Sequence, residues 1–426
     1  MIPSDSVSED SPAPLDALVE NHRAFLRYLE RRVGDRELAE DILQDAFIKV
    51  MDRPDQAPAG EGLIPWFYRT LRNAAIDRFR RREAASRAVE AFARELETHA
   101  APTSEIEAET CSLSEEERMK AARIHRFGPP DVIVVEDIPP PIPSTEEVLV
   151  RVAAAGVGPW DALIREGKSK VSPPPPLTLG SDLSGVVEGI GPNVTQFKAG
   201  DEVYGVTNLQ FVGAQAEFAV ASANMVAVKP PRLKAIDAAA VPVVAVTAWQ
   251  MLFDYARAET GEKVLILGAA GNVGAFAVQL AARAGLHVVA VVGSKDVDYV
   301  RTLGAETVID YQAGKFEAAV GSVDAVLDTV GGDTRDRAVR VLKTDGTLVS
   351  VVSTSGPTTA RADVRSVFFY VEVTTARLNA ISAMFDSGAL VPHVGTVLPL
   401  EDVRTAHKML AGAPHERGKI VLDVAG

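Results

Sequence analysis

Three glycines spaced three residues apart separate a strand-like run from a helix-like run in the second half of the chain. The segment VLILGAAGNVGAFAVQLAARAG (264–285) places Gly268, Gly271 and Gly274 at this turn. Glycines here let the backbone bend tightly and approach a pyrophosphate, whose charge then meets the free N–H groups at the start of the helix. A second strand-like run, HVVAVV, follows. The pattern predicts a dinucleotide-binding unit, with a purely structural tight turn as the alternative.

The residues after the second strand bear on which dinucleotide binds. NAD sites usually carry Asp or Glu at this position to hold the ribose 2′-hydroxyl, whereas this chain has Gly293, Ser294 and Lys295. A carboxylate about 4 Å from a 2′-phosphate would cost about 4 kcal/mol per unit charge at an effective dielectric of 20. Its absence, with a lysine in its place, favours NADP(H). In the alternative, Ser294 caps the next helix and Lys295 is merely solvated.

The pattern of predicted strands and helices changes along the chain. From about residue 243, strand-like and helix-like runs alternate, which predicts a parallel sheet with right-handed crossovers. Residues 119–235 carry short β-branched runs broken by Gly and Pro, which indicates a strand-rich unit. Residues 15–95 carry helical periodicity instead, with helices predicted over 37–51 and from about residue 64. The fold class is therefore multidomain, an N-terminal all-α bundle followed by an α/β unit, with residues 1–14 as a disordered arm and 96–118 as an acidic linker.

Composition excludes several classes of protein. Hydrophobic residues make up 47% of the 426 residues, which is typical of a globular protein. The single cysteine, Cys111, rules out an intrachain disulfide framework, and the N-terminal residues lack the pattern of a secretory signal, so we expect a cytoplasmic protein. The longest apolar run (238–253) is too short to span a bilayer, which predicts a buried helix and no membrane partner. The net charge of −14 argues against nonspecific nucleic-acid binding by the whole molecule.

Residues 119–426 resemble the medium-chain dehydrogenase/reductase superfamily, and within it the zinc-free quinone oxidoreductases. The resemblance rests on the ordered segments MKAARIHRFG, AAGVGPWDALIREG, LGSDLSGVVEGIGPNV, FKAGDEVYG, GAQAEFAVA, AVTAWQML, GAAGNVGAFAVQLA, LGAETVIDY, DTVGG and RGKIVL. It implies a GroES-like β-barrel catalytic domain (119–242), a Rossmann NADP-binding domain (243–374) and a C-terminal segment (375–426) that returns to the catalytic domain. It also implies a homodimer.

The resemblance assigns cofactor contacts residue by residue. The phosphate side is implied to hold Gly271, Val273, Gly274, Ser294, Lys295 and Tyr311, and the rest of the cofactor Thr247, Val330, Gly331 and Lys419. For Tyr311 a packed strand-end aromatic is the alternative. The activity implied is hydride transfer from NADPH to a quinone or an α,β-unsaturated carbonyl, with no assigned catalytic acid.

Two departures affect the catalytic end. Where zinc-dependent relatives have Gly-His-Glu, this chain has Ser181 and Asp182, and no His occurs between His125 and His287, so we expect no metal. The family's GVNPVD reads GVGPWD here, which replaces an Asn that contacts the nicotinamide end by Gly158. Trp160 and Asp161 are candidate residues of the substrate pocket, and a core role for Trp160 is the alternative.

The first hundred residues resemble region 2 of extracytoplasmic-function sigma factors, through ELAEDILQDAFIKVM and IPWFYRTLRNAAIDRFRRR. Seven arginines oppose Asp77 and Glu83 over residues 65–87, a local charge of +5. The resemblance implies polymerase contacts by Asp41, Gln44 and Asp45, base stacking by Trp66, Phe67 and Tyr68, phosphate contacts by arginines that include Arg72 and Arg80, and positions near the bases for Asn73 and Asp77. The alternative is an ordinary helical bundle with a solvated arginine face.

The two resemblances meet near Met119, where a reductase would naturally begin and where the second domain of a sigma factor is missing. A gene fusion, an engineered joining and an artefact of gene prediction remain alternatives. We favour an enzyme, because its motif set is complete. In the alternative function, the N-terminal part binds RNA polymerase core and promoter DNA while the reductase unit senses NADPH or redox state.

Overall fold

The computed structural model describes residues 118–352 and 361–425, together with Phe25, Leu26, Leu43, Ala46 and Phe67. The chain divides into two compact units, Met1–Ser112 and Leu113–Gly426.

In the N-terminal unit, all five described positions are helical, and Leu43 and Ala46 fall within the helix predicted over 37–51. Phe25 and Phe67 are fully buried, and their ring centroids lie 4.8 Å apart. The prediction that Phe67 stacks on promoter bases is therefore wrong, because its ring belongs to the core of this unit. The other polymerase and DNA candidates lie outside the described residues, as do the predicted disordered arm and residues 96–117 of the predicted linker.

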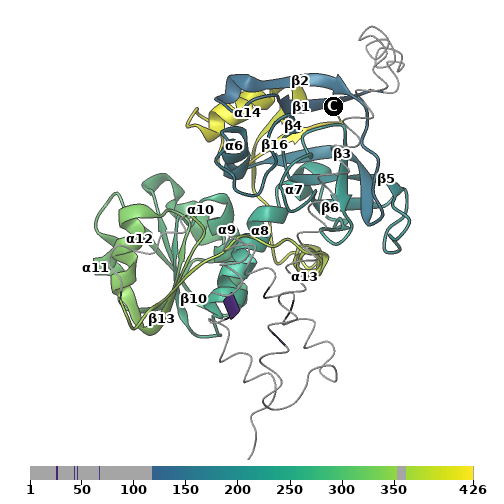
Figure 1. Ribbon diagram of the computed structural model, residues 1–426. Helices are drawn as coiled ribbons and strands as arrows, with labels where there is room; N and C mark the ends of the chain where they lie inside the picture. Colours follow the sequence, from purple (N-terminus) through teal and green to yellow (C-terminus); the bar gives the residue numbers. More distant parts are fainter. Residues whose placement is uncertain are drawn as a thin grey trace, which may run out of the picture. The chain divides into compact units, whose positions relative to one another are not determined.

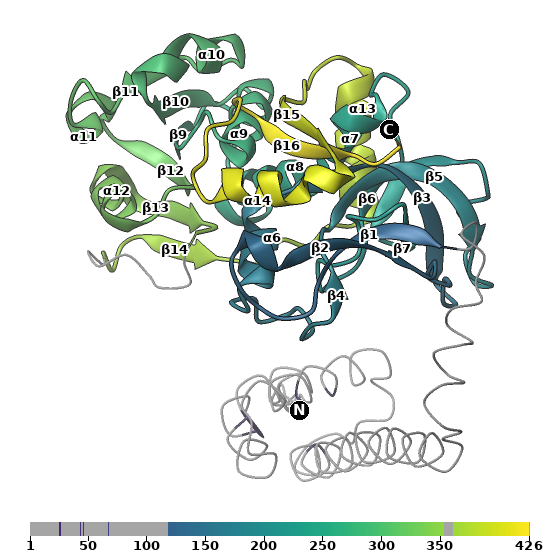
Figure 2. The same cartoon turned by 90° about the horizontal axis from the view of Figure 1, so that it is seen from above.

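The barrel part of the larger unit contains two sheets. One sheet has the strand order β2-β1-β4, and the other has the order β15-β16-β3-β5-β6-β8, with β7 also paired to β3. The strands are β1 (Met119–Ile124), β2 (Ile133–Ile138), β3 (Glu147–Val157), β4 (Leu177–Thr178), β5 (Asp182–Ile190), β6 (Glu202–Val206), β7 (Phe218–Ser222), β8 (Val226–Val228), β15 (Val394–Pro399) and β16 (Lys419–Asp423). Figure 2 shows the C-terminal β16 (yellow) beside β3 (blue), with which it pairs antiparallel. The last segment of the chain thus completes the larger of these two sheets.

Short helices connect and cover this part. α6 (Pro159–Arg165) follows β3 directly, and α7 (Ala235–Ala239) precedes the crossing to the second half. α13 (Thr375–Asp386) and α14 (Val403–Leu410) belong to the C-terminal segment. α14 contacts α6 and the turn at Pro130–Val132, so it closes one end of the barrel part.

The second part is a doubly wound sheet of six parallel strands in the order β11-β10-β9-β12-β13-β14 (Figure 1). Its elements are β9 (Lys263–Leu267), α9 (Asn272–Arg283), β10 (His287–Val292), α10 (Val297–Thr302), β11 (Thr307–Asp310), α11 (Phe316–Val320), β12 (Val323–Asp328), α12 (Gly332–Ala338), β13 (Leu342–Ser350) and β14 (Arg365–Phe368). The central strand β9 is apolar and buried from its second residue on, as expected for a sheet covered on both faces. The strand order reverses between β9 and β12, which is where such sheets bind ligands.

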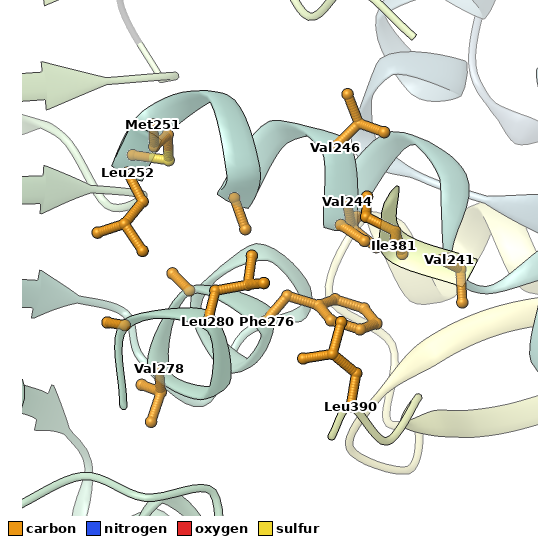
Figure 3. Packing of buried hydrophobic residues seen from close by; sticks show 14 of the residues in the cluster. Val241, Val244, Val246, Met251, Leu252, Phe276, Val278, Leu280, Ile381 and Leu390 are labelled. Carbon is orange, nitrogen blue, oxygen red and sulfur yellow. The ribbon is translucent and has the colours of Figure 1, made fainter. Parts of the chain in front are cut away.

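The longest apolar run of the chain packs into the hydrophobic core on one face of the parallel sheet. Residues 242–256 form α8 (Pro242–Trp249) and a π-helical segment (Gln250–Ala256) that pack on α9, with Val244, Leu252 and Phe276 among the buried side chains (Figure 3). The prediction of a buried helix is confirmed.

Across the described ranges 118–352 and 361–425, no helix is both apolar enough and long enough to cross a bilayer.

Candidate cofactor and substrate site

The glycine turn lies between β9 and α9 and brings two backbone segments into close contact. Gly268 has φ +71°, a left-handed conformation that favours glycine. Gly271 caps the start of α9. A methyl group at Gly274 would lie 2.2 Å from the carbonyl oxygen of Gly268 and 2.7 Å from the Cα of Ala269. The helix can therefore start this close to the strand only because position 274 has no side chain.

A cavity of about 1350 Å³ opens beside this turn, at the reversal of strand order. It brings together five of the predicted cofactor residues: Gly268, Gly271, Lys295, Tyr311 and Val330. The Tyr311 side chain is 56% exposed, so it is not a packed strand-end aromatic. The cavity is also lined by residues that were not predicted to contact the cofactor: Asn272, Asp296, Thr329, Thr334, Arg337, His393, His415 and Arg417. Several of these come from the C-terminal segment, so the barrel part and the parallel sheet share the cavity.

Ser294 lies at the predicted 2′-phosphate position, in a short turn after β10. Its hydroxyl is 2.5 Å from Oδ2 of Asp310 and 2.8 Å from Oε1 of Gln312. Asp310 ends the neighbouring strand β11. Sequence reasoning found no carboxylate at the end of β10 and missed this one, because it belongs to the next strand of the sheet.

A second group that was not predicted from the sequence, the Arg417 guanidinium, joins the C-terminal segment to the parallel sheet. The Arg417 guanidinium lies 2.5 Å from Oδ1 of Asp296 and 4.5 Å above the ring of Tyr299. The Tyr299 ring lies 4.9 Å from that of His393, between centroids. Burial, and next the positive charge of Arg417, lower the pKa of His393, so its imidazole is neutral at pH 7. Arg417 therefore contributes a cation to the cavity wall. The RGKIVL motif, which begins at Arg417, is the sequence feature that could have indicated this residue.

Six predicted cofactor residues are absent from the lining of this cavity: Ser294, described above, Lys419, described below, and four others. Gly274 is buried in the turn itself, and Val273 packs against the core beneath the sheet. Gly331 has φ +78° at the start of α12, where its N–H donates to Oδ1 of Asp328. Thr247 is 6% exposed, and its hydroxyl donates to the carbonyl oxygen of Val243 in its own helix. Contacts of these four residues with a cofactor stay predictions.

A buried ion pair lies on the barrel side of the site. Lys419 Nζ is 2.9 Å from Oδ2 of Asp182, and each side chain is 1% exposed. The other oxygen of Asp182 accepts from the backbone N–H of Val243. Lys419 Nζ also lies 4.1 Å from the ring centroid of Trp160, whose Nε1–H donates to the Ser181 hydroxyl at 2.9 Å. Lys419 lines a second, small cavity together with Gly271 and Asn272.

Asp161 is fully buried at the start of α6. One carboxylate oxygen accepts from the Gly158 N–H at 2.7 Å, and within the described part of the chain Oδ1 has no hydrogen-bond partner. Burial raises the pKa of Asp161 to about 7, although the hydrogen bond from Gly158 and the charge of Lys419 act in the opposite direction. The structure thus gives Asp161 a capping role, and its predicted place in the substrate pocket stays a prediction.

The residues at the position of a catalytic zinc do not fit that metal. Ser181 accepts the indole N–H, and Asp182 is committed to Lys419 and to the backbone. Zinc sites use Cys, His or carboxylate ligands, usually four in a tetrahedron. Among residues 118–352 and 361–425, no group of three or more His, Cys, Asp or Glu side chains could hold a metal ion.

Three family models match the chain. Residues 144–231 match the alcohol dehydrogenase GroES-like domain, residues 303–422 the zinc-binding dehydrogenase domain, and residues 18–85 sigma-70 region 2. Ser181 and Asp182, which do not suit zinc, lie within the first of these matches.

Individual relatives agree with these matches. Quinone oxidoreductase from Sus scrofa is 32% identical over 323 residues, which cover 71% of this chain and 97% of that protein. The mitochondrial NAD(P)H oxidoreductase RTN4IP1 from Bos taurus is 34% identical over 331 residues, covering 67% of this chain and 83% of that protein. The solved structure of the quinone oxidoreductase from Coxiella burnetii superposes with a TM-score of 0.67 at 31% identity, covering 72% of this chain and 99% of that one.

Proposed function

Because the chain belongs to the medium-chain dehydrogenase/reductase superfamily, with quinone oxidoreductases among its relatives, we propose that residues 119–426 form an NADPH-dependent, zinc-independent reductase of quinones or α,β-unsaturated carbonyls. The observation that carries the proposal is the cavity at the reversal of strand order, where a glycine turn faces cationic side chains. When bound, the reduced nicotinamide supplies a hydride. Water or a side chain supplies the proton that completes the reduced product.

The chain's own residues would hold the cofactor and exclude water. Gly268, Gly271 and Gly274 give a diphosphate access to the start of α9, whose free N–H groups attract negative charge. Lys295 adds positive charge to the cavity wall, where Arg417 is paired with Asp296. The donors that would stabilise charge on the acceptor oxygen are unassigned.

The test is NADPH oxidation by the full-length protein with a quinone and with an enone as acceptors. Gly274→Val is the control that should bind the cofactor more weakly, because its side chain would collide with the backbone of Gly268 and Ala269. We expect NADPH affinity to fall by roughly 10- to 100-fold in this variant. Tight NADPH binding by the wild type without turnover of either acceptor would overturn the reductase proposal and favour a sensor.

Two variants, each of which removes one charge, test the preference for NADPH. Lys295→Ala removes a cation from the cavity wall, and we expect the NADPH-to-NADH ratio of kcat/KM to fall by roughly 10- to 100-fold. Asp310→Asn removes the carboxylate beside Ser294 and should raise the same ratio. Steady-state kinetics with both cofactors measure it. A wild-type preference for NADH, or a ratio that neither variant changes, would contradict the NADPH assignment.

We also propose that the reductase unit forms a homodimer. β14 is the last strand of the parallel sheet, with β13 as its one partner within the described chain. Such a free edge is a common site of association between identical chains. The native mass of the full chain tests this proposal, and it also tests whether the two units exist as one polypeptide.

The match of residues 18–85 to sigma-70 region 2 favours a second function for the N-terminal unit. We propose that it binds RNA polymerase core through Asp41, Gln44 and Asp45 and promoter DNA through Trp66, Arg72, Asn73, Asp77 and Arg80. Full-length protein should then bind purified polymerase core, and Asp41→Ala with Asp45→Ala should weaken that binding. Equal binding by this double variant would contradict the assigned contacts, and no binding by the wild type would remove the function.

A further inference from the structure

Arg417 reaches from the barrel part to the parallel sheet beside the large cavity. It directly precedes β16, which pairs with β3 of the barrel part. Its guanidinium ends at the turn Ser294–Asp296, which follows β10 of the parallel sheet. Arg417, Lys295 and Asp296 all line the cavity. One side chain of the barrel part therefore contacts the turn that carries the predicted phosphate contact.

The backbone that carries Arg417 is fixed by two glycines. Gly418 has φ +116°, a conformation that favours glycine, and a methyl group there would lie 2.6 Å from the backbone nitrogen of Gly395. A methyl group at Gly395 would lie 2.6 Å from the carbonyl oxygen of Arg417. The Lys419 N–H donates to the carbonyl oxygen of His393 at 2.9 Å. The starts of β15 and β16 thus pack backbone against backbone, so Arg417 extends from a rigid base.

The guanidinium contacts three different groups of the parallel-sheet part. Nη2 lies 2.5 Å from Oδ1 of Asp296 and donates to the carbonyl oxygen of Lys295 at 3.2 Å. The guanidinium also lies over the ring of Tyr299 in α10, a favourable contact for a cation. The Asp296 side chain is 15% exposed, so solvent screens this pair less than it screens a pair on the open surface. Arg417 therefore holds a carboxylate, a backbone carbonyl and the following helix together.

Packing alone does not fix the turn that Arg417 contacts. None of the three residues of the turn is buried. On its other side, the Ser294 hydroxyl contacts Asp310 and Gln312. Lys295 lies between these two anchors, and within the part of the chain that the structure describes its ammonium has no ion-pair partner. Lys295 is therefore available to an anionic ligand, whereas Arg417 is already paired.

We propose that Arg417 is a positioning residue for cofactor recognition: from the barrel part it fixes the turn after β10, so that Lys295 is held ready for the 2′-phosphate. The inference rests on the proposed preference for NADPH. A lysine on an unsupported turn loses conformational freedom when it binds a phosphate, and a turn that is fixed beforehand reduces that cost. Arg417 thus raises the affinity for the phosphorylated cofactor without contacting it.

The double variant Arg417→Gln/Asp296→Asn removes this link without changing the net charge. Isothermal titration calorimetry on the full-length protein measures the Kd of NADPH and of NADH. We expect the ratio of the NADH Kd to the NADPH Kd to fall about three- to tenfold, the effect of ordering one long side chain and its turn. Arg301→Gln/Asp298→Asn is the matched control, since it removes an exposed pair at 3.0 Å within α10 and should leave the ratio unchanged.

A Lys295→Ala background separates positioning from direct contact with the phosphate. If Arg417 acts through Lys295, adding Arg417→Gln/Asp296→Asn to Lys295→Ala should change the ratio by less than about twofold. An equal fall in both backgrounds would show that Arg417 contacts the phosphate itself, and it would overturn the inference. So would a ratio that the double variant leaves unchanged when Lys295 is present.

Hydrogen exchange without any cofactor tests the fixed turn directly. The backbone N–H groups of Ser294 and Asp296 donate to Gln312 and Gly293. Mass spectrometry of peptides that cover the turn should show faster exchange in Arg417→Gln/Asp296→Asn than in the wild type. Unchanged exchange would reject the inference alone. A wild type that binds NADH as tightly as NADPH would instead reject the proposed cofactor preference, and with it the role of Arg417 in phosphate recognition.

Discussion

Lys419→Met should lower the free energy of unfolding by about 3–5 kcal/mol, the cost expected when one partner of a buried ion pair is removed. Lys419 and Asp182 are each 1% exposed and lie 2.9 Å apart. Methionine keeps most of the apolar stem but, within the described chain, leaves the Asp182 carboxylate with the Val243 N–H as its remaining partner. Chemical denaturation at neutral pH measures the loss.

Two comparisons sharpen this prediction. Asp182→Asn/Lys419→Met leaves no buried charge and should recover a large part of the loss, because uncharged replacements of buried pairs are often well tolerated. Lys343→Met breaks the exposed pair with Asp324, in which the lysine is 49% exposed, and should cost less than about 1 kcal/mol. Similar losses in Lys343→Met and Lys419→Met would show that burial does not set the cost.

Asp161→Asn should stabilise the protein above pH 7, by up to about 4 kcal/mol. The folded-state pKa of Asp161 is raised from 3.8 to about 7, chiefly by burial. Between pH 4 and pH 7 the folded protein therefore keeps a proton that the unfolded chain has released, and the contribution of Asp161 to stability falls as pH rises. Asparagine stays neutral, and its carbonyl can still accept from the Gly158 N–H.

His407 contributes with the opposite sign over nearly the same range. It is fully buried, and its Nδ1 lies 2.7 Å from Nη1 of Arg165. Burial and the charge of Arg165 lower its pKa from 6.5 to about 3. Below pH 6.5 the unfolded chain therefore binds a proton that the folded chain does not, and stability is lost as pH falls towards 3.

In each variant, the change of stability with pH should show the contribution of the residue that is still titratable. This is His407 in Asp161→Asn and Asp161 in His407→Gln. Between pH 4 and 6.5 the opposing contributions largely cancel in the wild type. Asp161→Asn should become more stable with rising pH in this range, and His407→Gln, which keeps an acceptor for Arg165, should become less stable. Denaturation at a series of pH values measures both slopes. Parallel curves for the two variants would contradict these assignments.

Local patterns in the sequence determine much of the fold of this protein. The glycine turn, the alternation of strands and helices after residue 243 and the buried run at 238–253 depend on residues close together in the sequence, and the observed elements agree with them. Five of the predicted cofactor residues line one cavity because each follows or precedes a strand end at the same edge of the parallel sheet.

The tertiary structure decided whatever depended on residues distant in the chain. Asp182 and Lys419 are 237 positions apart, and they meet because β3 pairs with both β16 and β5. Asp310 reaches Ser294 because β11 lies next to β10, although the end of β10 read alone lacked a carboxylate. Phe67 sits in a basic, aromatic segment that looks suited to DNA, yet its ring packs on Phe25. Composition and spacing fix the type of each element, whereas burial and charge pairing depend on which elements become neighbours.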